Sequence, residues 1–255
     1  MVVENAFRTA KAEFDRDGFA VIQGFFAPQA AQDLIEQVDR YIARIVPTLP
    51  AESVFYEDKQ NPESVMRLER MNTRDPYFDD MLHAERFTGL ASTLLDDSVV
   101  PKHLEMFAKA PRIGKPTPPH QDGNYFMLAP NEALTFWLPI DSVDEENGCV
   151  RYVRGSHRRG MRHHDPSGVF GFSLGITDYG TEDEQQEVAV CVEPGDAIIH
   201  HGLTIHRTDA NPTDRQRRAI GIVYYAGRAR IDEALARQND HQAKVFEQWK
   251  AEGKL

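Results

Sequence analysis

The feature that most constrains the fold of this chain is a run of short, β-type segments separated by turns, between residues 99 and 226. The turns include Asn147-Gly148, Pro194-Gly195 and Asn211-Pro212, and such pairs typically end strands. Many short strands with this punctuation predict a sandwich or barrel, so we expect a mainly β chain with a jelly-roll core and flanking helices. The expected strands are 103–109, 124–128, 134–140, 149–154, 188–193, 196–200 and 217–226.

Helical periodicity flanks this β region on both sides. Apolar residues recur at three- and four-residue spacing from Pro28 to about residue 46 and again over 77–96. The segment from Ile231 to Lys250 is also expected to be helical. Short apolar runs at 17–26 and 65–71 are expected to be strands.

These patterns fit one domain over residues 1–255, since β folds of this length commonly form a single unit. We expect N-terminal helical support at about 1–97, a β core at about 98–226 and a C-terminal helix at about 231–252.

Composition narrows the classes of partner. The chain carries 29 basic and 40 acidic residues, a formal net charge of −11. This negative charge would oppose binding to nucleic acid or to an anionic membrane by a chain without a dedicated basic site, so we expect neither partner. The 41% hydrophobic and 27% charged residues match ordinary globular proteins and exclude disordered and fibrous classes. Oligomeric state is not fixed by any feature of the sequence.

Cysteine usage and the N-terminal residues suggest a compartment. Cys149 and Cys191 are too few for a disulfide scaffold and do not form a C-x-x-C pair. The N-terminus lacks a basic start followed by an apolar run, and no stretch approaches about 18 apolar residues. We therefore expect a soluble, cytoplasmic protein.

The sharpest local pattern is His120-Gln121-Asp122, which follows a proline-rich segment. Neutral imidazole is the commonest metal ligand. On a strand, positions i and i+2 project to the same face, so His120 and Asp122 are expected to offer a nitrogen and a carboxylate oxygen to one metal ion.

A third ligand is then needed, and the candidates are His200, His201 and His206. Two histidines and a carboxylate form the facial arrangement of non-haem Fe(II) oxygenases, which leaves coordination positions open for a co-substrate and dioxygen. His206 has the more informative context because Arg217 follows it at the start of an apolar strand.

A guanidinium entering an apolar strand must reach solvent or find an anion, and it binds carboxylates through two parallel hydrogen bonds. A dicarboxylate co-substrate would supply that anion to Arg217. Thr208 would share the strand face of His206 and could donate its hydroxyl to the same carboxylate.

Several further motifs accompany these residues along the chain. The set is Asp17-Gly18-Phe19-Ala20-Val21, His120-Gln121-Asp122, Glu146-Asn147-Gly148-Cys149, Gly155-Ser156-His157, Pro194-Gly195-Asp196, His206, Asn211 and Arg217. With this set, the chain resembles the phytanoyl-CoA dioxygenase family of Fe(II)- and 2-oxoglutarate-dependent oxygenases over roughly residues 12–226.

The resemblance implies a double-stranded β-helix (jelly-roll, cupin-like) fold that uses Fe(II), 2-oxoglutarate and O2. It implies that iron is bound by His120, Asp122 and His206. The 2-oxoglutarate contacts that it implies are Arg217, Thr208, Trp137 and, through a looser match, Arg67. The implied activity is hydroxylation of an unactivated carbon of a small-molecule metabolite, with release of succinate and CO2.

Other interpretations stay open at the level of sequence. A non-catalytic, metal-binding barrel would use the histidines structurally, and a cupin-like metalloenzyme would act without 2-oxoglutarate. Trp137 could simply pack in the core. Candidate substrate contacts are Gln121, Asn124, Tyr125 and the basic stretch 154–164, although a charged run is more often a solvated loop.

Overall fold

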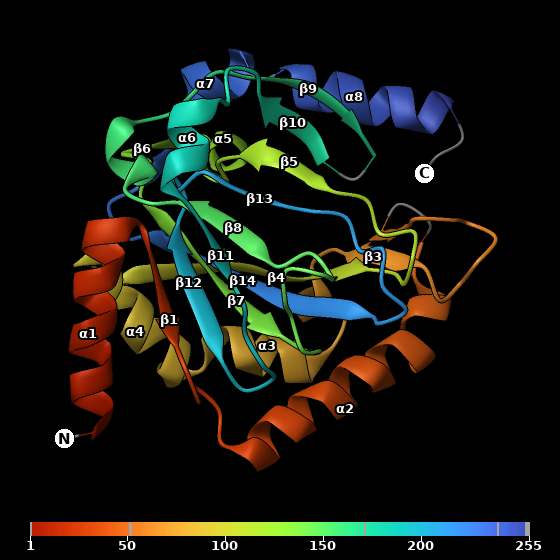
Figure 1. Ribbon diagram of the computed structural model, residues 1–255, viewed down its shortest axis with the longest axis horizontal. Helices are drawn as coiled ribbons and strands as arrows, with labels where there is room; N and C mark the ends of the chain where they lie inside the picture. The colour runs from red at the N-terminus through yellow and green to blue at the C-terminus, as the bar shows by residue number, and fades with distance from the viewer. Residues whose placement is uncertain (1, 51–52, 171, 239, 253–255) are drawn as a thin grey trace.

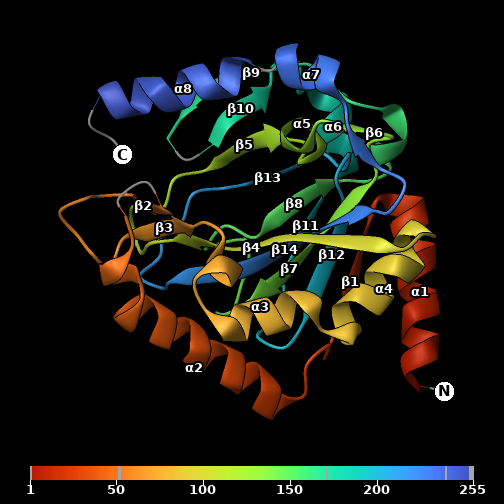
Figure 2. The same cartoon turned by 180° about the vertical axis from the view of Figure 1, so that it is seen from behind.

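A seven-stranded antiparallel sheet, in the order β1-β12-β7-β14-β4-β3-β2, forms the larger layer of the structure (Figures 1 and 2). The structure is a computed structural model that describes residues 2–50, 53–170, 172–238 and 240–252. The strands of this sheet are β1 (Phe19–Ile22), β2 (Val54–Tyr56), β3 (Val65–Leu68), β4 (Val99–Lys109), β7 (Ala133–Pro139), β12 (Ala197–His201) and β14 (Arg217–Ala226).

A smaller four-stranded sheet, in the order β11-β8-β13-β5, faces the larger one. Phe19 and Trp137 of the large sheet pack in one apolar cluster with Val150 and Tyr152 of the small sheet. The two sheets thus form a cupin-like jelly roll, which confirms the expected fold class. The strands of the small sheet are β5 (Thr117–His120), β8 (Val150–Val153), β11 (Glu187–Val190) and β13 (His206–Thr208).

Helices pack on the outer face of the large sheet (Figure 2). In α2, Pro28 occupies the first turn, where its missing N–H costs nothing, and Leu34, Val38 and Tyr41 form the buried face. These residues share one apolar cluster with the outward-facing side chains of the sheet. The helices on this side are α1 (Val2–Asp17), α2 (Pro28–Arg44), α3 (Pro76–His83) and α4 (Glu85–Leu95).

A hairpin and the C-terminal helices lie at the opposite end of the molecule, beyond the small sheet (Figures 1 and 2). β10 (Phe172–Ile176) contacts β5, and α8 (Asp240–Ala251) contacts both β9 (His164–Val169) and β10. The remaining elements are α5 (Gly123–Phe126), β6 (Leu128–Ala129), α6 (Thr181–Gln186), β15 (Arg230–Ile231), α7 (Glu233–Gln238) and the short 3₁₀ turns Val46–Thr48, Met71–Thr73 and Ser156–Arg159.

Most of the expected elements are present, and a few expectations are wrong. The predicted strand 124–128 is instead the helical turn α5 followed by the short β6. The helix expected over 77–96 is two helices, because Ala84 between them is extended (φ −64°, ψ 136°). The C-terminal prediction corresponds to α7 and α8, with residue 239 outside the described residues.

The N-terminal third is more than helical support. It also supplies β1, β2 and β3 to the large sheet, at both of its edges. The sequence patterns did not predict α1, α6 or the β9–β10 hairpin.

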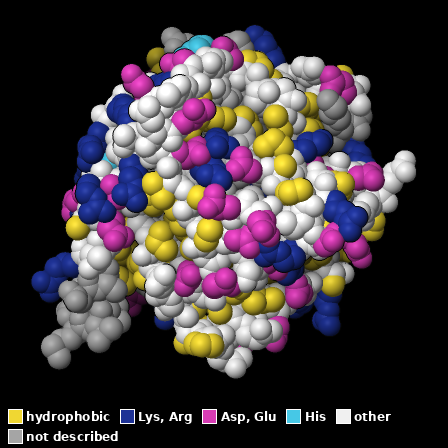
Figure 3. Space-filling model, viewed as in Figure 1, with side chains coloured by type: hydrophobic (Ala, Val, Ile, Leu, Met, Phe, Trp, Pro, Cys, Tyr) yellow, Lys and Arg dark blue, Asp and Glu magenta, His cyan; other side chains and the backbone are white. Residues whose placement is uncertain are grey.

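The surface mixes charges of both signs, as Figure 3 shows for one face. Arg218, for example, pairs with Asp39 and Asp141. Among the described residues, no helix has both the length and the apolar character needed to cross a membrane.

Candidate metal centre and its cavity

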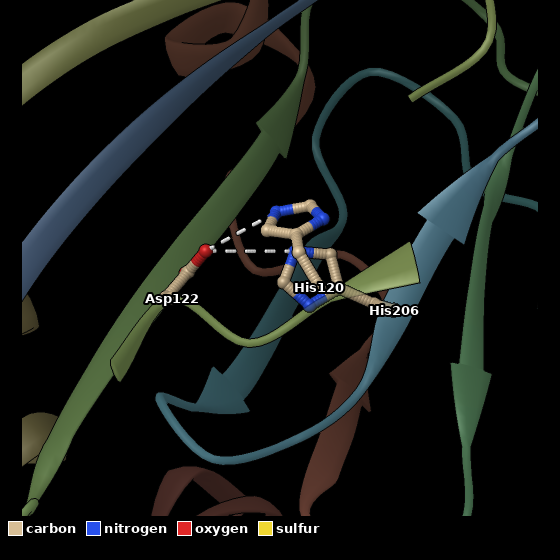
Figure 4. A group of neighbouring side chains, drawn as sticks. All are labelled: His120, Asp122 and His206. Atoms are coloured by element: carbon tan, nitrogen blue, oxygen red, sulfur yellow. Dashed lines mark ion pairs between the residues drawn. The ribbon is translucent and has the colours of Figure 1, made fainter. Parts of the chain in front are cut away.

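Three side chains that could hold a metal ion converge between the two sheets: His120, Asp122 and His206 (Figure 4). One potential ligand atom from each lies within 4.8 Å of the others. The Nε2 atoms of His120 and His206 are 3.5 Å and 3.6 Å from Oδ1 of Asp122. This donor set and its facial arrangement match those of non-haem Fe(II) sites.

Strand pairing brings the two histidines together. His206 of β13 is directly opposite His120 of β5, and their ring centroids are 4.2 Å apart. Asp122 lies beyond the end of β5 in a helical conformation (φ −55°, ψ −35°). The expectation that His120 and Asp122 share one strand face is therefore wrong, because the chain turns at Asp122 and so brings the carboxylate back towards the ring.

Backbone carbonyls fix the orientation of both rings. Nδ1 of His120 donates to the carbonyl of Pro118 at 2.9 Å, and Nδ1 of His206 donates to the carbonyl of Thr204 at 3.0 Å. Since a carbonyl only accepts, each ring carries its proton on Nδ1 and keeps Nε2 free for a metal ion.

The second oxygen of Asp122 is held by the protein. Oδ2 accepts hydrogen bonds from Thr135 Oγ1 at 2.8 Å and from His200 Nε2 at 3.0 Å. The hydroxyl of Tyr152 donates to Nδ1 of His200 at 3.0 Å. His200, one of the three histidine candidates, thus orients a candidate ligand, while His201 lies near Phe14 and His157.

Electrostatics at this centre favour the ligand forms of the side chains. Burial lowers the pKa of His206 well below its usual value, and the nearby His120 lowers it further. Burial would raise the pKa of Asp122, but its contacts with His206, His120 and His200 bring it well below its ordinary value. A neutral imidazole and an ionised carboxylate are the forms that bind metals.

Arg217 lies in the same cavity at the start of β14, and its guanidinium is 5.6 Å from the ring centroid of Trp137. The side chain is 3% exposed, and Nε has no hydrogen-bond partner among the described residues. Burial lowers the pKa of Arg217 to about 10, so it is still a cation at neutral pH. A buried guanidinium donor without an acceptor is costly, which indicates a site for an anion.

Two further polar residues, Thr208 and Lys109, line the cavity together with Arg217. Thr208 Oγ1 accepts a hydrogen bond from the Thr117 N–H at 3.3 Å, so its own proton can be donated elsewhere. Lys109 is paired directly across from Arg217, is 2% exposed and donates to the Lys115 carbonyl. Burial, followed by the charge of Arg217, places the pKa of Lys109 well below its usual value.

One cavity of about 690 Å³ contains the metal candidates and all four residues predicted to contact 2-oxoglutarate: Arg217, Thr208, Trp137 and Arg67. Arg67 differs from Arg217 because Glu105 already pairs with it, at 2.8 Å from Nη2 and 2.9 Å from Nε. Its guanidinium also lies 5.4 Å from the ring centroid of Phe107. His103 contacts the other oxygen of Glu105 at 3.3 Å.

Of the candidate substrate contacts, some line the cavity and others do not. Tyr125 lines the cavity. Gln121 is fully buried, donates to the carbonyls of Gly160 and Leu203, and is structural in this conformation. The described residues of the 154–164 stretch do not line the cavity, and its Arg162 pairs with Asp178 and Asp183. Asn124 is likewise absent from the cavity lining.

Comparison of the sequence with families gives a clear match. The model of a family described as phytanoyl-CoA dioxygenase (PhyH) matches residues 14–219. A phytanoyl-CoA dioxygenase domain-containing protein 1 homolog from Caenorhabditis elegans is 24% identical over 256 residues, which cover 83% of this chain and 88% of the relative.

Two solved structures share the fold. The epimerase SnoN in complex with Fe3+, alpha ketoglutarate and nogalamycin RO has a TM-score of 0.72 at 22% identity, covering 89% of this chain and 86% of the other. EctD from S. alaskensis with 2-oxoglutarate and 5-hydroxyectoine has a TM-score of 0.71 at 21% identity, covering 87% and 77%. At these identities the likeness concerns the fold.

Proposed function

Because the chain belongs to the phytanoyl-CoA dioxygenase family, we propose that it is a non-haem Fe(II)- and 2-oxoglutarate-dependent dioxygenase. We propose further that it hydroxylates an unactivated carbon of a small-molecule metabolite and releases succinate and CO2. The observation that carries the proposal is the buried Arg217, whose Nε has no partner among the described residues, in one cavity with the triad. This combination suits a dicarboxylate that extends from a metal ion to the guanidinium.

The triad fits ferrous iron in the nature of its donors. His120, His206 and Asp122 would hold the ion through two Nε2 atoms and Oδ1, in the facial set that leaves three positions open. A structural zinc site would instead be closed by a fourth protein ligand. Among the described residues, the cluster of potential ligands contains three members.

The part of the cavity around Arg217 would suit 2-oxoglutarate. Arg217 and the hydroxyl of Thr208 would bind its distal carboxylate, and Trp137 would cover one side of it. The solved relatives support this choice, since their descriptions name alpha ketoglutarate with Fe3+ for SnoN and 2-oxoglutarate for EctD. Arg67 is retained as a further proposed contact, which Glu105 would have to share.

Bound iron and 2-oxoglutarate would supply the oxidising power, with dioxygen, 2-oxoglutarate and a C–H bond converted to succinate, CO2 and an alcohol. The chain's own groups bind and orient the reactants. The Nδ1–H of each histidine holds its ring in place through a backbone carbonyl, and His200 with Thr135 holds the carboxylate.

The finer outcome of oxidation is open to test, because SnoN, which shares the fold, is described as an epimerase. The carboxylate at Asp122 favours hydroxylation over halogenation, since a small residue there would leave room for chloride on the metal. Analysis of the product, by mass and by incorporation of labelled dioxygen, distinguishes hydroxylation from epimerisation or ring formation.

The first experiment measures succinate from 2-oxoglutarate with the iron-loaded protein, beside His206→Ala and Arg217→Ala. We expect succinate from the wild type and loss of most of it in both variants. Anaerobic titration of 2-oxoglutarate into the iron-loaded protein, followed by the visible charge-transfer absorption of the complex, gives a reading independent of turnover. Failure of 2-oxoglutarate to bind would favour the metal-binding barrel without this activity.

We also propose a reducing, cytoplasmic location, supported by the two free cysteines, Cys149 and Cys191. Microscopy of the tagged protein in its native cell tests this, and an organellar signal would contradict it.

A further inference from the structure

Trp249 on the C-terminal helix α8 lines the same cavity as the metal triad. The family model ends at residue 219, whereas α8 begins at Asp240. Trp249 is 7% exposed. The helix therefore adds a wall to the cavity that the matched part of the chain does not provide.

Trp249 begins a row of rings that reaches the large sheet. Its ring centroid is 5.1 Å from that of Phe170, with an interplanar angle of 67°. Phe170 is in turn 5.8 Å from Phe55 on β2, at 47°. All three line the cavity. Aromatic rings at such distances and angles attract one another, so this ring row (Trp249, Phe170 and Phe55) forms one packed group in the cavity wall, in which Phe55 is almost fully buried (2% exposed).

The elements that carry the ring row also contact the strand that carries His120, a candidate metal ligand. Figures 1 and 2 both show α8 lying along the β9–β10 hairpin, and α8 contacts both strands. β10 contacts β5, the strand that ends in His120. The position of Trp249 is therefore set by the same elements that position a metal ligand.

The cavity is larger than the proposed cofactors need. At most about 300 Å³ is required by 2-oxoglutarate, if each of its roughly ten non-hydrogen atoms takes the ~30 Å³ of a water molecule in the liquid. More than half of the 690 Å³ is then left for a substrate. Pockets of this kind bind mostly through apolar walls and orient the ligand with a few polar groups.

Resting on the function proposed above, we propose that the ring row binds a planar, apolar ring system of the primary substrate, and that α8 thereby determines specificity. Rigid aromatic side chains give wide apolar contact at a small cost in conformational entropy. The Arg67–Glu105–His103 cluster lines the same cavity and faces the polar substituents of that molecule. A small, fully polar substrate would leave the ring row without a partner.

The test uses 2-naphthol and decahydro-2-naphthol, which share a carbon skeleton and a hydroxyl group but differ in planarity. Glucose is the polar probe. Binding to the full chain loaded with 2-oxoglutarate and Mn(II), which replaces ferrous iron without supporting turnover, is measured by calorimetry. We expect 2-naphthol to bind at least about threefold more tightly than its saturated counterpart, because only planar rings stack on aromatic side chains, and glucose not to bind.

Substitutions in the ring row test whether 2-naphthol binds there. Trp249→Ala should raise the Kd of 2-naphthol at least about tenfold, whereas Trp249→Phe should keep it within about threefold. Phe170→Ala tests the same row from another element and should also weaken binding. The matched control is Leu235→Ala, an exposed apolar residue of α7 that does not line the cavity, and it should change nothing.

The outcomes separate this inference from the proposed function. Unchanged 2-naphthol binding in Trp249→Ala, equal binding of the saturated compound, or no binding to the wild type overturns the inference, while measured 2-oxoglutarate binding would leave the proposed function standing. If Trp249→Ala and Phe170→Ala each lost the binding of 2-oxoglutarate as well as that of 2-naphthol, the rings would have a structural role and the inference would also be overturned. Trp249-dependent binding of 2-naphthol in a protein that fails to bind 2-oxoglutarate would refute the proposed function alone.

Discussion

Asp122 divides its carboxylate between two tasks. Oδ1 faces His120 and His206, whereas Oδ2 accepts hydrogen bonds from Thr135 and His200. Contacts of this kind, one step beyond the ligands, orient the ligating atom, and their loss typically lowers metal affinity about 10–100-fold. The orientation of Oδ1 therefore depends on two residues that do not themselves touch the proposed metal.

We accordingly expect His200→Ala to weaken Fe(II) binding about 10–100-fold, measured by anaerobic titration. Tyr152→Phe removes only the hydrogen bond to His200 and should weaken binding less than about tenfold. The control is His201→Ala, since that neighbouring ring contacts Phe14 and His157 instead. Equal Fe(II) affinity in His200→Ala and His201→Ala would contradict the positioning role.

Arg217 gives a prediction about the co-substrate. Truncating one partner of a buried charge pair costs about 2 kcal/mol or more, so Arg217→Ala should raise the KM for 2-oxoglutarate at least about 30-fold. Arg218→Ala is the matched control, because its guanidinium pairs with Asp141 and Asp39. Succinate formation at varied 2-oxoglutarate gives the constants, and a KM that shifts equally in both variants would refute the assignment.

The candidate ligands His120, Asp122 and His206 could be identified from the sequence, but the residues that hold the Asp122 carboxylate in place could not. An H-x-D pattern followed by a histidine and an arginine singles out four residues along the chain. Thr135 and His200 show no such pattern, and they are 13 and 78 residues from Asp122. Register puts them together, since His200 of β12 is paired directly with Thr135 of β7, and register is not readable from one sequence.

At the scale of elements, the entry into β1 depends on Gly18. Its φ of +86° is disfavoured for other residues, and a Cβ there would lie 2.5 Å from both His157 Nδ1 and Thr204 Oγ1. Gly24, just beyond the other end of β1, also has a positive φ (+61°), but nothing lies within 4 Å of its Cβ position. Substitutions at the two glycines therefore separate the cost in stability of a left-handed backbone from the cost of steric crowding.

Gly24→Ala should lower the free energy of unfolding by about 1–2 kcal/mol, the cost of a left-handed backbone. Gly18→Ala should lower it by roughly 1–3 kcal/mol more, because the added methyl group also displaces packed side chains. Urea unfolding of both variants measures the difference. Indistinguishable losses would show that the contacts around Gly18 relax freely.

Elements with strong periodicity could be predicted, whereas those set by distant contacts could not. The apolar spacing of α2 and the β-branched run of β14 correspond to a helix and a strand. Residues 124–128 have β-type composition, but the first three belong to α5, which Gly202 holds by accepting a hydrogen bond from the Gly123 N–H at 2.7 Å. β9 contains Pro166, Ser167 and Gly168, which are typical of a loop.

At the scale of the whole molecule, the jelly roll was predictable because it follows from many short strands with regular turns. The cavity was only partly predictable. The candidate metal ligands at one part of it come from β5, β13 and the turn after β5. The wall formed by Trp249 and Phe170 joins residues that are far apart in the sequence and meet only when α8 packs on the β9–β10 hairpin. No local pattern in a single chain encodes that packing.

The cavity also links global stability to pH through Glu105. Burial would raise the pKa of this carboxyl, but the charge of Arg67 and the contact with His103 lower it from 4.5 to about 2. The native state therefore binds fewer protons than the unfolded state between these values. The stabilisation that Glu105 contributes is complete above about pH 4.5, is lost as the pH falls towards 2, and amounts to about 3 kcal/mol.

Glu105→Gln removes this titration while keeping a polar side chain opposite Arg67. The variant should be less stable than the wild type near neutral pH, because Arg67 loses a buried anionic partner. Between about pH 5 and pH 3, however, its free energy of unfolding should fall by about 2 kcal/mol less than that of the wild type. Urea unfolding across this range measures both slopes, with the exposed Glu63→Gln as the control that should follow the wild type. If the free energy of unfolding had the same slope against pH in Glu105→Gln and the wild type, the Arg67–Glu105 pair would not govern acid stability. The acid sensitivity would then have to come from carboxylates outside the cavity, such as Asp209 between Arg151 and Arg207.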